Sequence, residues 1–327
     1  MNYLAVDSGT TNTRVWLMRG TEVAAKRQVP AGVRNTAIDG HNRVLMREIR
    51  RAILELRNSA SPEDRPNILI AAGMITSDLG LHEVKHAQAP AGIEDLAAGI
   101  QTCRFDKTDD VLFHFIPGVR SGPAVADLQN VNTIDIMRGE ETEIFGALEE
   151  FDLHGPILYL HLGSHTKMIQ VDASQRISDG ASTLGGELLL SIQQQTILRS
   201  SLPETQVTAL DEEFFQQGWE NCQRFGVTRA LYLVRIFDLN SSFPKTSLFS
   251  FLLGVLLHQE FRCFDLLAAR TGTDQVVLSG LPHLQPAWSH ALKRGGFRVR
   301  CLTAEETERA FLVGLLGIFN RYQHFIA

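Results

Sequence analysis

The sequence predicts an α/β protein built from two similar lobes. Residues 3–19 have the pattern of a strand, a short polar turn and a returning strand, and residues 157–172 repeat that pattern. The chain has 327 residues, more than one hydrophobic core usually supports, which also favours two domains. We expect the join near residues 149–155, where Gly155 and Pro156 interrupt the regular pattern.

The remaining elements alternate between strand and helix, as in α/β proteins. Further strands are expected over residues 23–29, 68–72, 175–181, 274–279 and 297–302. Helices are expected over residues 42–57, 184–195, 211–225, 228–237 and 245–269. Another helix should begin near Pro282, and a closing helix should have Thr303 as its N-cap with Glu306 completing a capping box.

Composition and charge exclude several classes of protein. Hydrophobic residues make up 44% of the chain and charged residues 21%, the mix of an ordinary globular protein. The net charge is -6 and no basic stripe is present, which argues against a nucleic-acid partner. The N-terminus has no basic segment followed by a long apolar stretch, so neither a signal peptide nor a membrane span is expected. Four widely spaced cysteines without a CxxC pair indicate reduced thiols in a cytoplasmic protein.

The first polar turn has the features of a phosphate-binding loop beside a metal-binding carboxylate. Its glycine would let a phosphate approach the backbone, and its N–H groups can form an anion-binding concavity. Mg²⁺ prefers hard oxygen ligands, and Asp7 would supply one next to bound phosphates. The residues expected to hold the nucleotide here are Asp7, Ser8, Gly9, Thr10, Thr11, Asn12 and Arg14. A plain hairpin with a polar turn would use the same residue types.

The second polar turn lies at the matching point of the second lobe. Two such loops facing one another could hold the phosphates of one nucleotide, and the second would do so with Gly163, Ser164, His165, Thr166 and Lys167. His165 and Lys167 could instead only support the hairpin. A buried strand ends at Ser279 and Gly280, where an adenine ring could lie close to the backbone. The chain contains no GxxxxGK[ST] sequence, so a P-loop would not be the source of ATP binding.

A candidate general base lies between the two hairpins. Gly139 predicts a turn, and the two carboxylates after it fall in the first turn of a helix, where the helix dipole favours them. Acidic first turns are also common for structural reasons alone. Phosphoryl transfer needs one residue that orients and deprotonates the acceptor hydroxyl, which makes Glu140 or Glu141 our candidate, with Asp135 in reserve. Arg138 could pair bidentately with a substrate carboxylate.

A candidate substrate-binding segment follows the buried strand over residues 68–72. Gly73, Met74, Ile75 and Ser77 lie where that strand ends, and ligands of open α/β sheets bind outside the carboxyl ends of strands. An ordinary turn between a strand and a loop is the alternative.

These motifs, in this order, resemble the superfamily of acetate and sugar kinases, heat-shock proteins and actin. A narrower set resembles the 2-dehydro-3-deoxygalactonokinase family and spans nearly the whole chain. The motifs are Val6-Asp7-x-Gly-Thr-Thr-Asn-x-Arg14, Ala72-Gly73-Met74-Ile75-x-Ser77, Ile116-Pro117-Gly118, Met137-Arg-Gly-Glu-Glu-Thr142, Gly163-x-His165-x-Lys167 and Gly186-Glu187-Leu188.

The resemblance implies two ribonuclease H-like lobes of the actin and hexokinase type, flanking a nucleotide cleft. Residues 1–150 would carry the first phosphate loop and most of the sugar pocket, and residues 151–327 the second loop and the adenosine site. The implied reaction is transfer of a phosphoryl group from ATP, with Mg²⁺, to the 6-hydroxyl of 2-dehydro-3-deoxy-D-galactonate in galactonate catabolism. Gly186 and Glu187 would join the substrate-binding residues. No nucleic-acid or membrane partner is implied, and a homodimer is compatible with the resemblance.

The chain departs from the family pattern at three places. Leu162-Gly163-Ser164-His165 stands where the family has Pro-Gly-Thr-His, and Gly185-Gly186-Glu187-Leu188 stands where it has Thr-Gly-Glu-Leu. Residues 80–90 lack the tryptophan and the Pro-Tyr pair of the family, which leaves the exact sugar acid open.

Two other functions and one other motif remain as alternatives. An exopolyphosphatase-like or nucleotide phosphohydrolase would use a glutamate to activate water, and a non-catalytic actin-like protein would only bind ATP. His82-Glu83-Val84-Lys85-His86 matches the zinc-protease pattern HExxH. Gly80 and Pro90 leave too little room for the helix that this chemistry needs, so we expect a loop near the substrate.

Overall fold

A computed structural model describes residues 1–108 and 110–326 and divides the chain into two compact units. Unit 1 contains Met1–His154, Gln175–Asp179 and the C-terminal residues from Thr307, and unit 2 contains Gly155–Ser174 and Gly180–Glu306. In the described ranges no helix is long and apolar enough to cross a membrane.

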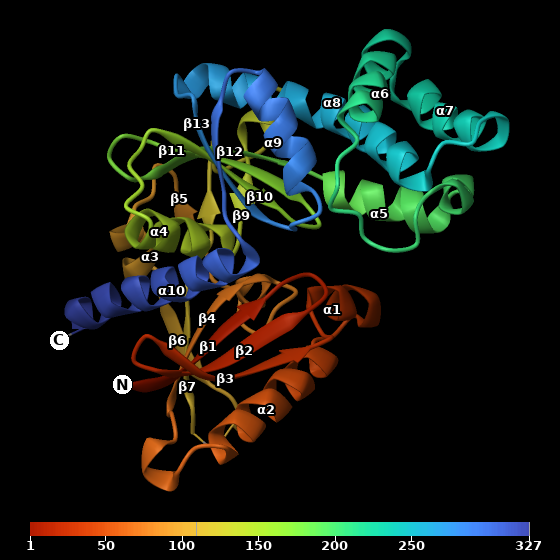
Figure 1. Ribbon diagram of the computed structural model, residues 1–327. Coiled ribbons are helices and arrows are strands. Elements are labelled where there is room, and N and C mark those ends of the chain that lie inside the picture. The colour runs from red at the N-terminus through yellow and green to blue at the C-terminus, as the bar shows by residue number, and fades with distance from the viewer. Residues whose placement is uncertain (109, 327) are drawn as a thin grey trace. The chain divides into compact units, whose positions relative to one another are not determined.

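The larger sheet of unit 1 contains six strands in the order β3-β2-β1-β4-β7-β6 (Figure 1). Their bounds are β1 Asn2–Ser8, β2 Thr13–Arg19, β3 Glu22–Val29, β4 Ile68–Gly73, β6 Gln101–Arg104 and β7 Leu112–Phe115. Strands β1, β2 and β3 form an antiparallel meander, and β1 also pairs in parallel with β4. A small sheet joins β5 (Ala87–Gln88), β8 (Val119–Arg120) and β9 (Ile136–Met137).

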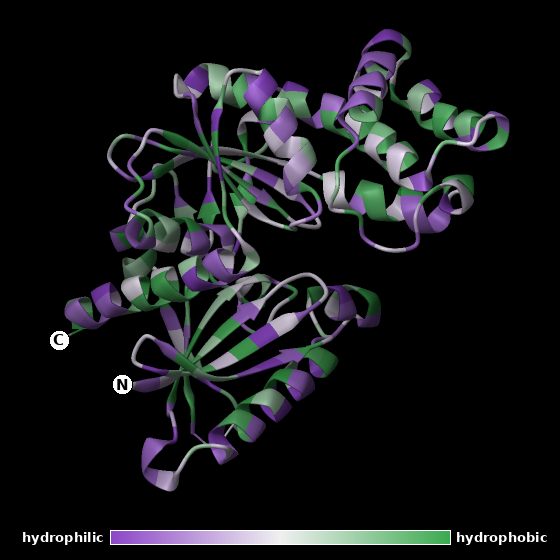
Figure 2. Cartoon of the chain, in the orientation of Figure 1, coloured by the Kyte–Doolittle hydropathy of each residue, from purple (hydrophilic) through white to green (hydrophobic). Residues whose placement is uncertain are grey.

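The helices of unit 1 lie on the sheet or connect its strands. They are α1 Val33–Asp39, α2 Arg43–Asn58, η1 Pro62–Asp64, η2 Met74–Thr76, α3 Ile93–Ala98, η3 Val131–Thr133, α4 Glu140–Glu150 and most of α10 Ala304–Ile326. On α2 the buried residues Leu45, Ile49, Ile53 and Leu56 recur every three or four positions, so they form one face that packs against the sheet. Burying each of these side chains is worth about 1.5–3 kcal/mol. Figure 2 shows hydrophobic and hydrophilic residues alternating along this helix.

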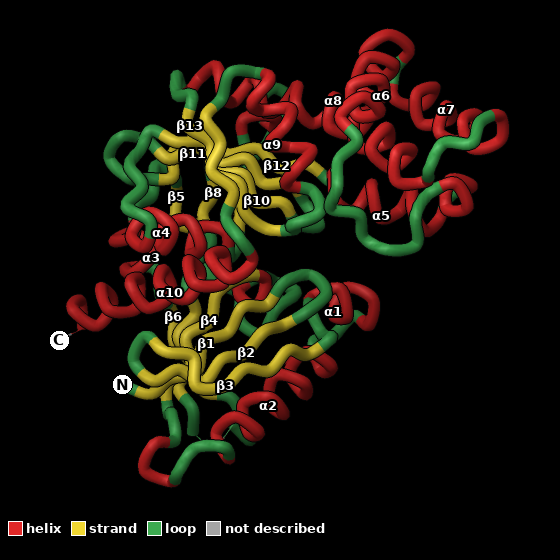
Figure 3. The backbone as a smooth tube through the Cα atoms, in the orientation of Figure 1, coloured by secondary structure: helices red, strands yellow, loops and turns green. Residues whose placement is uncertain are grey.

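The sheet of unit 2 repeats this plan with five strands in the order β12-β11-β10-β13-β14 (Figure 3). The bounds are β10 Ile157–Leu162, β11 Thr166–Val171, β12 Ile177–Thr183, β13 Gln275–Gly280 and β14 Arg298–Cys301, and residues 177–179 of β12 fall in unit 1. The helices are α5 Gly185–Gln195, η4 Ile197–Ser201, α6 Glu212–Phe225, α7 Val227–Asn240, α8 Lys245–Thr271 and α9 Gln285–Arg294. The long helix α8 is buried along most of its length and packs against α6.

Within each sheet, the first strand of the hairpin pairs with its parallel neighbour in the same way at the carboxyl end. In unit 1, Ser8 of β1 pairs with Gly73 of β4, and in unit 2, Leu162 of β10 pairs with Gly280 of β13. Both glycines have positive φ, 91° and 88°, where residues with a Cβ are strained. This repetition confirms the predicted α/β fold with two similar lobes.

Some predicted boundaries were wrong. Helix α9 begins at Gln285, three residues after Pro282, and its early proline is Pro286. The expected strand over residues 175–181 is shifted to Ile177–Thr183. Most of α10, from Thr307 onward, belongs to unit 1 and not to the second lobe expected over residues 151–327. The backbones of α4 and α10 touch there, because a Cβ added at Gly146 or at Gly314 would overlap the other helix.

Candidate active site

The carboxyl ends of β1 and β4 form the base of the site in unit 1. Asp7 pairs in register with Arg14 on β2 and accepts a hydrogen bond from its Nη2 at 2.5 Å. The Asp7 charge raises the pKa of Arg14. Gly73 closes the other side, since a Cβ there would lie 2.6 Å from the Ser8 carbonyl oxygen and 3.2 Å from Asp7 Oδ1. Only a glycine leaves this side of the carboxylate open.

The first loop, residues 9–12, is held by its backbone. The Gly9 N–H donates to the Asn12 carbonyl at 2.9 Å, and the Gly9 and Thr10 carbonyls accept from the N–H groups of Val33 and Arg34 in α1. Below the loop, the hydroxyls of Ser8 and Thr13 are 2.9 Å apart. Thr11 and Asn12 are exposed at the tip. The loop is therefore fixed while its tip residues reach solvent.

Helix α4 begins directly against this base. Gly139, with φ of 107°, precedes the helix, and a Cβ on it would lie 3.2 Å from the Gly73 Cα. The Arg138 N–H donates to Glu140 Oε2 at 3.0 Å, and the Gly139 N–H donates to both carboxylate oxygens of Glu141 at 2.9 and 2.8 Å. The predicted turn and acidic first helical turn are thus present.

The two neighbouring glutamates differ in environment. Glu140 is half-buried, whereas Glu141 has no exposed surface. Burial, and next the charge of Glu140, raise the pKa of Glu141 to about 7, although the Gly139 N–H and Arg138 act in the opposite direction. Glu141 is held inside the turn, and Glu140 is the member of the pair with access to solvent.

Arg138 ties the predicted substrate segment to this turn. Its Nη1 donates to Thr76 Oγ1 and its Nη2 to the Val84 carbonyl, both at 2.8 Å, and Nη2 lies 3.5 Å from His86 Nδ1. Burial lowers the pKa of the guanidinium. The two terminal nitrogens expected to bind a substrate carboxylate are therefore engaged with the protein.

The predicted substrate residues have unequal access to solvent. Met74 is half-buried, whereas Ile75 is fully buried in the core and Ser77 donates to the Met74 carbonyl at 2.8 Å. The HExxH segment is a loop, as expected. His82 bonds to Gln101 at 2.9 Å and stacks on Phe115, so its imidazole is used within unit 1.

The second loop lies at the equivalent end of unit 2, but its charges differ. His161 and Lys167 are paired at the register positions that Asp7 and Arg14 occupy in unit 1. His161 Nδ1 is 3.2 Å from Ser279 Oγ on β13. Gly280, predicted to bind the adenosine, must be glycine for packing reasons as well, because a Cβ there would collide with the Leu162 backbone.

The N-terminus of α5 packs directly on the second loop. A Cβ on Gly186 would overlap the Gly163 carbonyl, and the Glu187 N–H donates to the Ser164 carbonyl at 2.8 Å. Glu187 Oε1 lies 3.9 Å from His165 Nε2. Gly186 and Glu187, predicted to bind substrate, thus pack on the second loop of unit 2.

Comparison with known proteins decides the family. The family model for 2-keto-3-deoxy-galactonokinase matches residues 7–318, almost the entire chain. The chain belongs to this family. The sequence-based prediction of a sugar-acid kinase is thereby confirmed, and a kinase of this family uses ATP as phosphoryl donor.

Individual relatives agree with the family. The chain is 28% identical over 263 residues to the 2-dehydro-3-deoxygalactonokinase of Escherichia coli strain K12, covering 79% of this chain and 78% of the relative. A crystal structure of a candidate 2-dehydro-3-deoxygalactonokinase from Sinorhizobium meliloti matches with a TM-score of 0.74 at 25% identity, covering 96% of this chain and 95% of that one.

A more distant structure shares the fold alone. The activator of 2-hydroxyisocaproyl-CoA dehydratase from Clostridium difficile matches with a TM-score of 0.51 at 12% identity, over 100% of this chain and 97% of that one.

The residues of unit 1 suit the metal that accompanies ATP in kinases. Among the described residues no group of three or more His, Cys, Asp or Glu could form a metal cage. Mg²⁺ bound to nucleotide phosphates needs only one or two carboxylates, because phosphates and waters fill its other positions. Asp7 fits this need, since Arg14 bonds Oδ2 and the glycine at position 73 keeps the Oδ1 side open.

Sequence reasoning missed three polar residues of this kinase. Thr76 lay inside a predicted segment but carries the contact to Arg138, and His161 lies two residues before the predicted second loop. Glu260 lies far away in sequence, on α8, yet accepts a hydrogen bond from Thr166. The repeated hairpin pattern could have identified His161 by alignment with Asp7, whereas nothing local indicates Glu260.

Proposed function

We propose that this kinase transfers the γ-phosphoryl group of MgATP to the 6-hydroxyl of 2-keto-3-deoxygalactonate. The family and the Escherichia coli relative support the substrate. The observation that carries the mechanism is the contact of Gly139 with Gly73, because it joins the acidic first turn of α4 to the strand end that pairs with Asp7 and Ser8.

Asp7 is the proposed carboxylate for the metal, and the first loop the proposed phosphate site of unit 1. Mg²⁺ bound with the nucleotide would neutralise charge on the transferring phosphoryl group. Arg14 orients Asp7 through their 2.5 Å contact. In unit 2 the proposed phosphate contacts are the loop over residues 163–165 and Lys167, with Ser279 and Gly280 proposed for the adenosine. A homodimer and a cytoplasmic location remain predictions.

Glu140 is the proposed general base. It is half-buried and accepts one backbone hydrogen bond, so one carboxylate oxygen remains to receive a proton from the acceptor hydroxyl. Glu141 is fully buried and both of its oxygens accept from the Gly139 N–H, which supports a role in shaping the turn. Arg138 is assigned to holding the substrate loop through Thr76 and Val84.

Paired substitutions test the assignment of the base. Glu140→Gln should lower kcat by about 10²–10⁴-fold, the usual contribution of general-base catalysis, and leave the melting temperature nearly unchanged. Glu141→Gln should retain a larger share of kcat and alter the melting temperature. The reverse pattern, with Glu140→Gln active and Glu141→Gln inactive but folded, would assign the base to Glu141.

A further inference from the structure

Glu260 is a buried carboxylate outside the residues assigned above. It lies on α8 and is 9% exposed. Buried carboxylates are costly unless several donors satisfy them. Its three donors lie in two stretches of unit 2, one at Thr166 directly after the second loop and one over residues 183–185, where β12 leads into α5.

The first two donors are threonine hydroxyls at strand ends. Thr166 is the first residue of β11, directly after the loop, and its Oγ1 donates to Glu260 Oε2 at 3.3 Å. Thr183 is the last residue of β12, and its Oγ1 donates to Glu260 Oε1. Thr166 is 1% exposed, so its hydroxyl donates to Glu260 inside the fold.

The third donor is the backbone N–H of Gly185 at the start of α5. A Cβ at position 185 would overlap the Glu260 carboxylate, so glycine is required for this approach. This residue is one of the departures from the family pattern, which has threonine there. The next residues, Gly186 and Glu187, contact the Gly163 and Ser164 carbonyls.

We propose that Glu260 is a positioning residue that sets the second phosphate loop and the start of α5 for nucleotide binding. The Glu260 carboxylate holds both the start of β11, which follows the loop, and the start of α5, which packs on the loop. Losing it would loosen both segments together. The effect belongs to MgATP affinity and not to the sugar acid or the phosphoryl transfer step, whose proposed residues lie in unit 1. The proposal rests on the function proposed above only in taking residues 163–165 as a nucleotide site.

The test compares Glu260→Gln with wild type in MgADP binding by calorimetry and in steady-state kinetics. The amide keeps the shape of the side chain, but it carries no charge and offers one acceptor oxygen in place of two. We expect a weakening of MgADP binding and a rise in the MgATP KM by about tenfold, the scale of one buried charged hydrogen bond. The sugar-acid KM and kcat at saturating MgATP should stay within about twofold of wild type.

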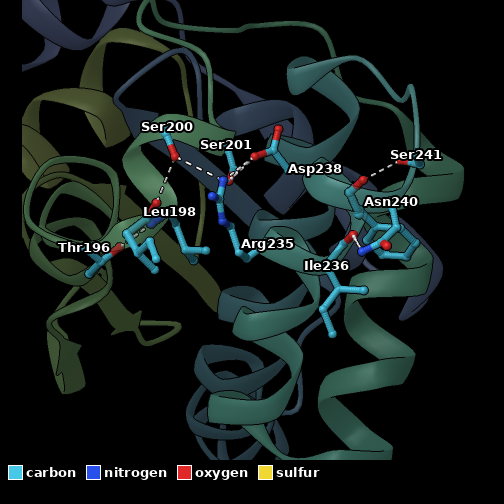
Figure 4. Close-up of polar contacts among 11 residues, drawn as sticks. Thr196, Leu198, Ser200, Ser201, Arg235, Ile236, Asp238, Asn240 and Ser241 are labelled. Atoms are coloured by element: carbon cyan, nitrogen blue, oxygen red, sulfur yellow. Dashed lines mark hydrogen bonds and ion pairs between the residues drawn. The ribbon is translucent and has the colours of Figure 1, made fainter.

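Asp238→Asn is the matched control in the same unit. Asp238 accepts from Arg235 at 2.6 Å and from Ser201 at 2.8 Å in the helical part of unit 2 (Figure 4). It should lower stability without changing the nucleotide KM. Hydrogen exchange should accelerate at residues 163–166 and 185–188 in Glu260→Gln alone. If both variants change all kinetic constants alike, or if Glu260→Gln binds MgADP as wild type does, the proposal is wrong.

A second pair covers the case in which Glu260→Gln fails to fold. Thr183→Val removes one donor with little change in volume, and Thr183→Ser keeps the hydroxyl. We expect weaker MgADP binding in the valine variant and near-normal binding in the serine variant, and equal binding in the two would overturn the proposal. Because MgADP binding is measured without sugar acid, the result stands even if 2-keto-3-deoxygalactonate proves not to be the acceptor.

Discussion

At the residue scale, two neighbouring glutamates have different proposed roles because one is buried and the other reaches solvent. Glu140 and Glu141 are adjacent in sequence, yet only Glu141 is sealed by two bonds from one backbone N–H. Sequence alone left the choice between them open, because both fit the first turn of a helix. The distinction arises from the Gly139 N–H, which donates to both carboxylate oxygens of Glu141 and holds this side chain inside the turn.

His114 should make stability depend on pH. It is 5% exposed on β7 against Phe319 and Tyr322 of α10, and burial lowers its pKa to about 4. The unfolded chain therefore binds more protons between about pH 4 and the ordinary histidine pKa of about 6.5, and stability falls as pH decreases through that window. The term is worth at most about 3 kcal/mol. His114→Phe should remove it in urea unfolding measured from pH 4 to 7, whereas His41→Phe, at an exposed site, should not.

Glu141 should change the dependence of stability on pH in the direction opposite to His114. Its pKa is raised to about 7, so the folded chain binds more protons than the unfolded chain between about pH 4.5 and 7, and this term is lost as pH rises through that window. Glu141→Gln should therefore make stability increase more steeply with pH, because the His114 term then acts without opposition. Identical pH profiles for wild type and Glu141→Gln would show that Glu141 titrates normally.

At the element scale, local sequence signals located most strands and helices but not their packing. The capping box of α10 was predicted correctly, with the Thr303 N–H donating to Glu306 at 2.8 Å and the Glu306 N–H to Thr303 at 3.1 Å. The start of α9 was wrong because two prolines lie close together and only Pro286 lies within the helix. Glu260 was missed because its partners come from β11, β12 and α5, which no local pattern links to α8.

The crossing of α4 and α10 should be sensitive to one methyl group. A Cβ at Gly314 would overlap the Thr142 carbonyl of α4, so Gly314→Ala should destabilise the protein by about 1–3 kcal/mol or more, as overpacking does. Gly317→Ala is the control on the same helix. Its Cβ would meet only side-chain ends, those of Glu149, Arg321 and Ile93, at 3.3 Å or more, and alanine favours helix by about 1 kcal/mol. Urea unfolding that ranks Gly314→Ala at or above wild type would contradict this packing.

At the scale of the whole molecule, a duplicated frame carries different chemistry in its two copies. The pair at the end of the first hairpin is Asp7 with Arg14, and the equivalent pair in the second is His161 with Lys167. At these paired positions the first copy therefore has a carboxylate and the second does not, which agrees with placing the metal contact at Asp7. The duplication was predictable because strand and turn patterns are local, whereas the change of charge became clear only once the register was known.

As a member of its family, this chain should be a kinase whose phosphoryl acceptor is 2-keto-3-deoxygalactonate. The most direct test is ADP release from MgATP, measured with and without that sugar acid, for the wild type and Glu140→Gln. We predict release that depends on the sugar acid in the wild type and falls by about 10²–10⁴-fold in the variant. Release at the same rate without any acceptor would contradict the claim and indicate a phosphohydrolase, and release stimulated only by a different sugar would contradict the assigned substrate.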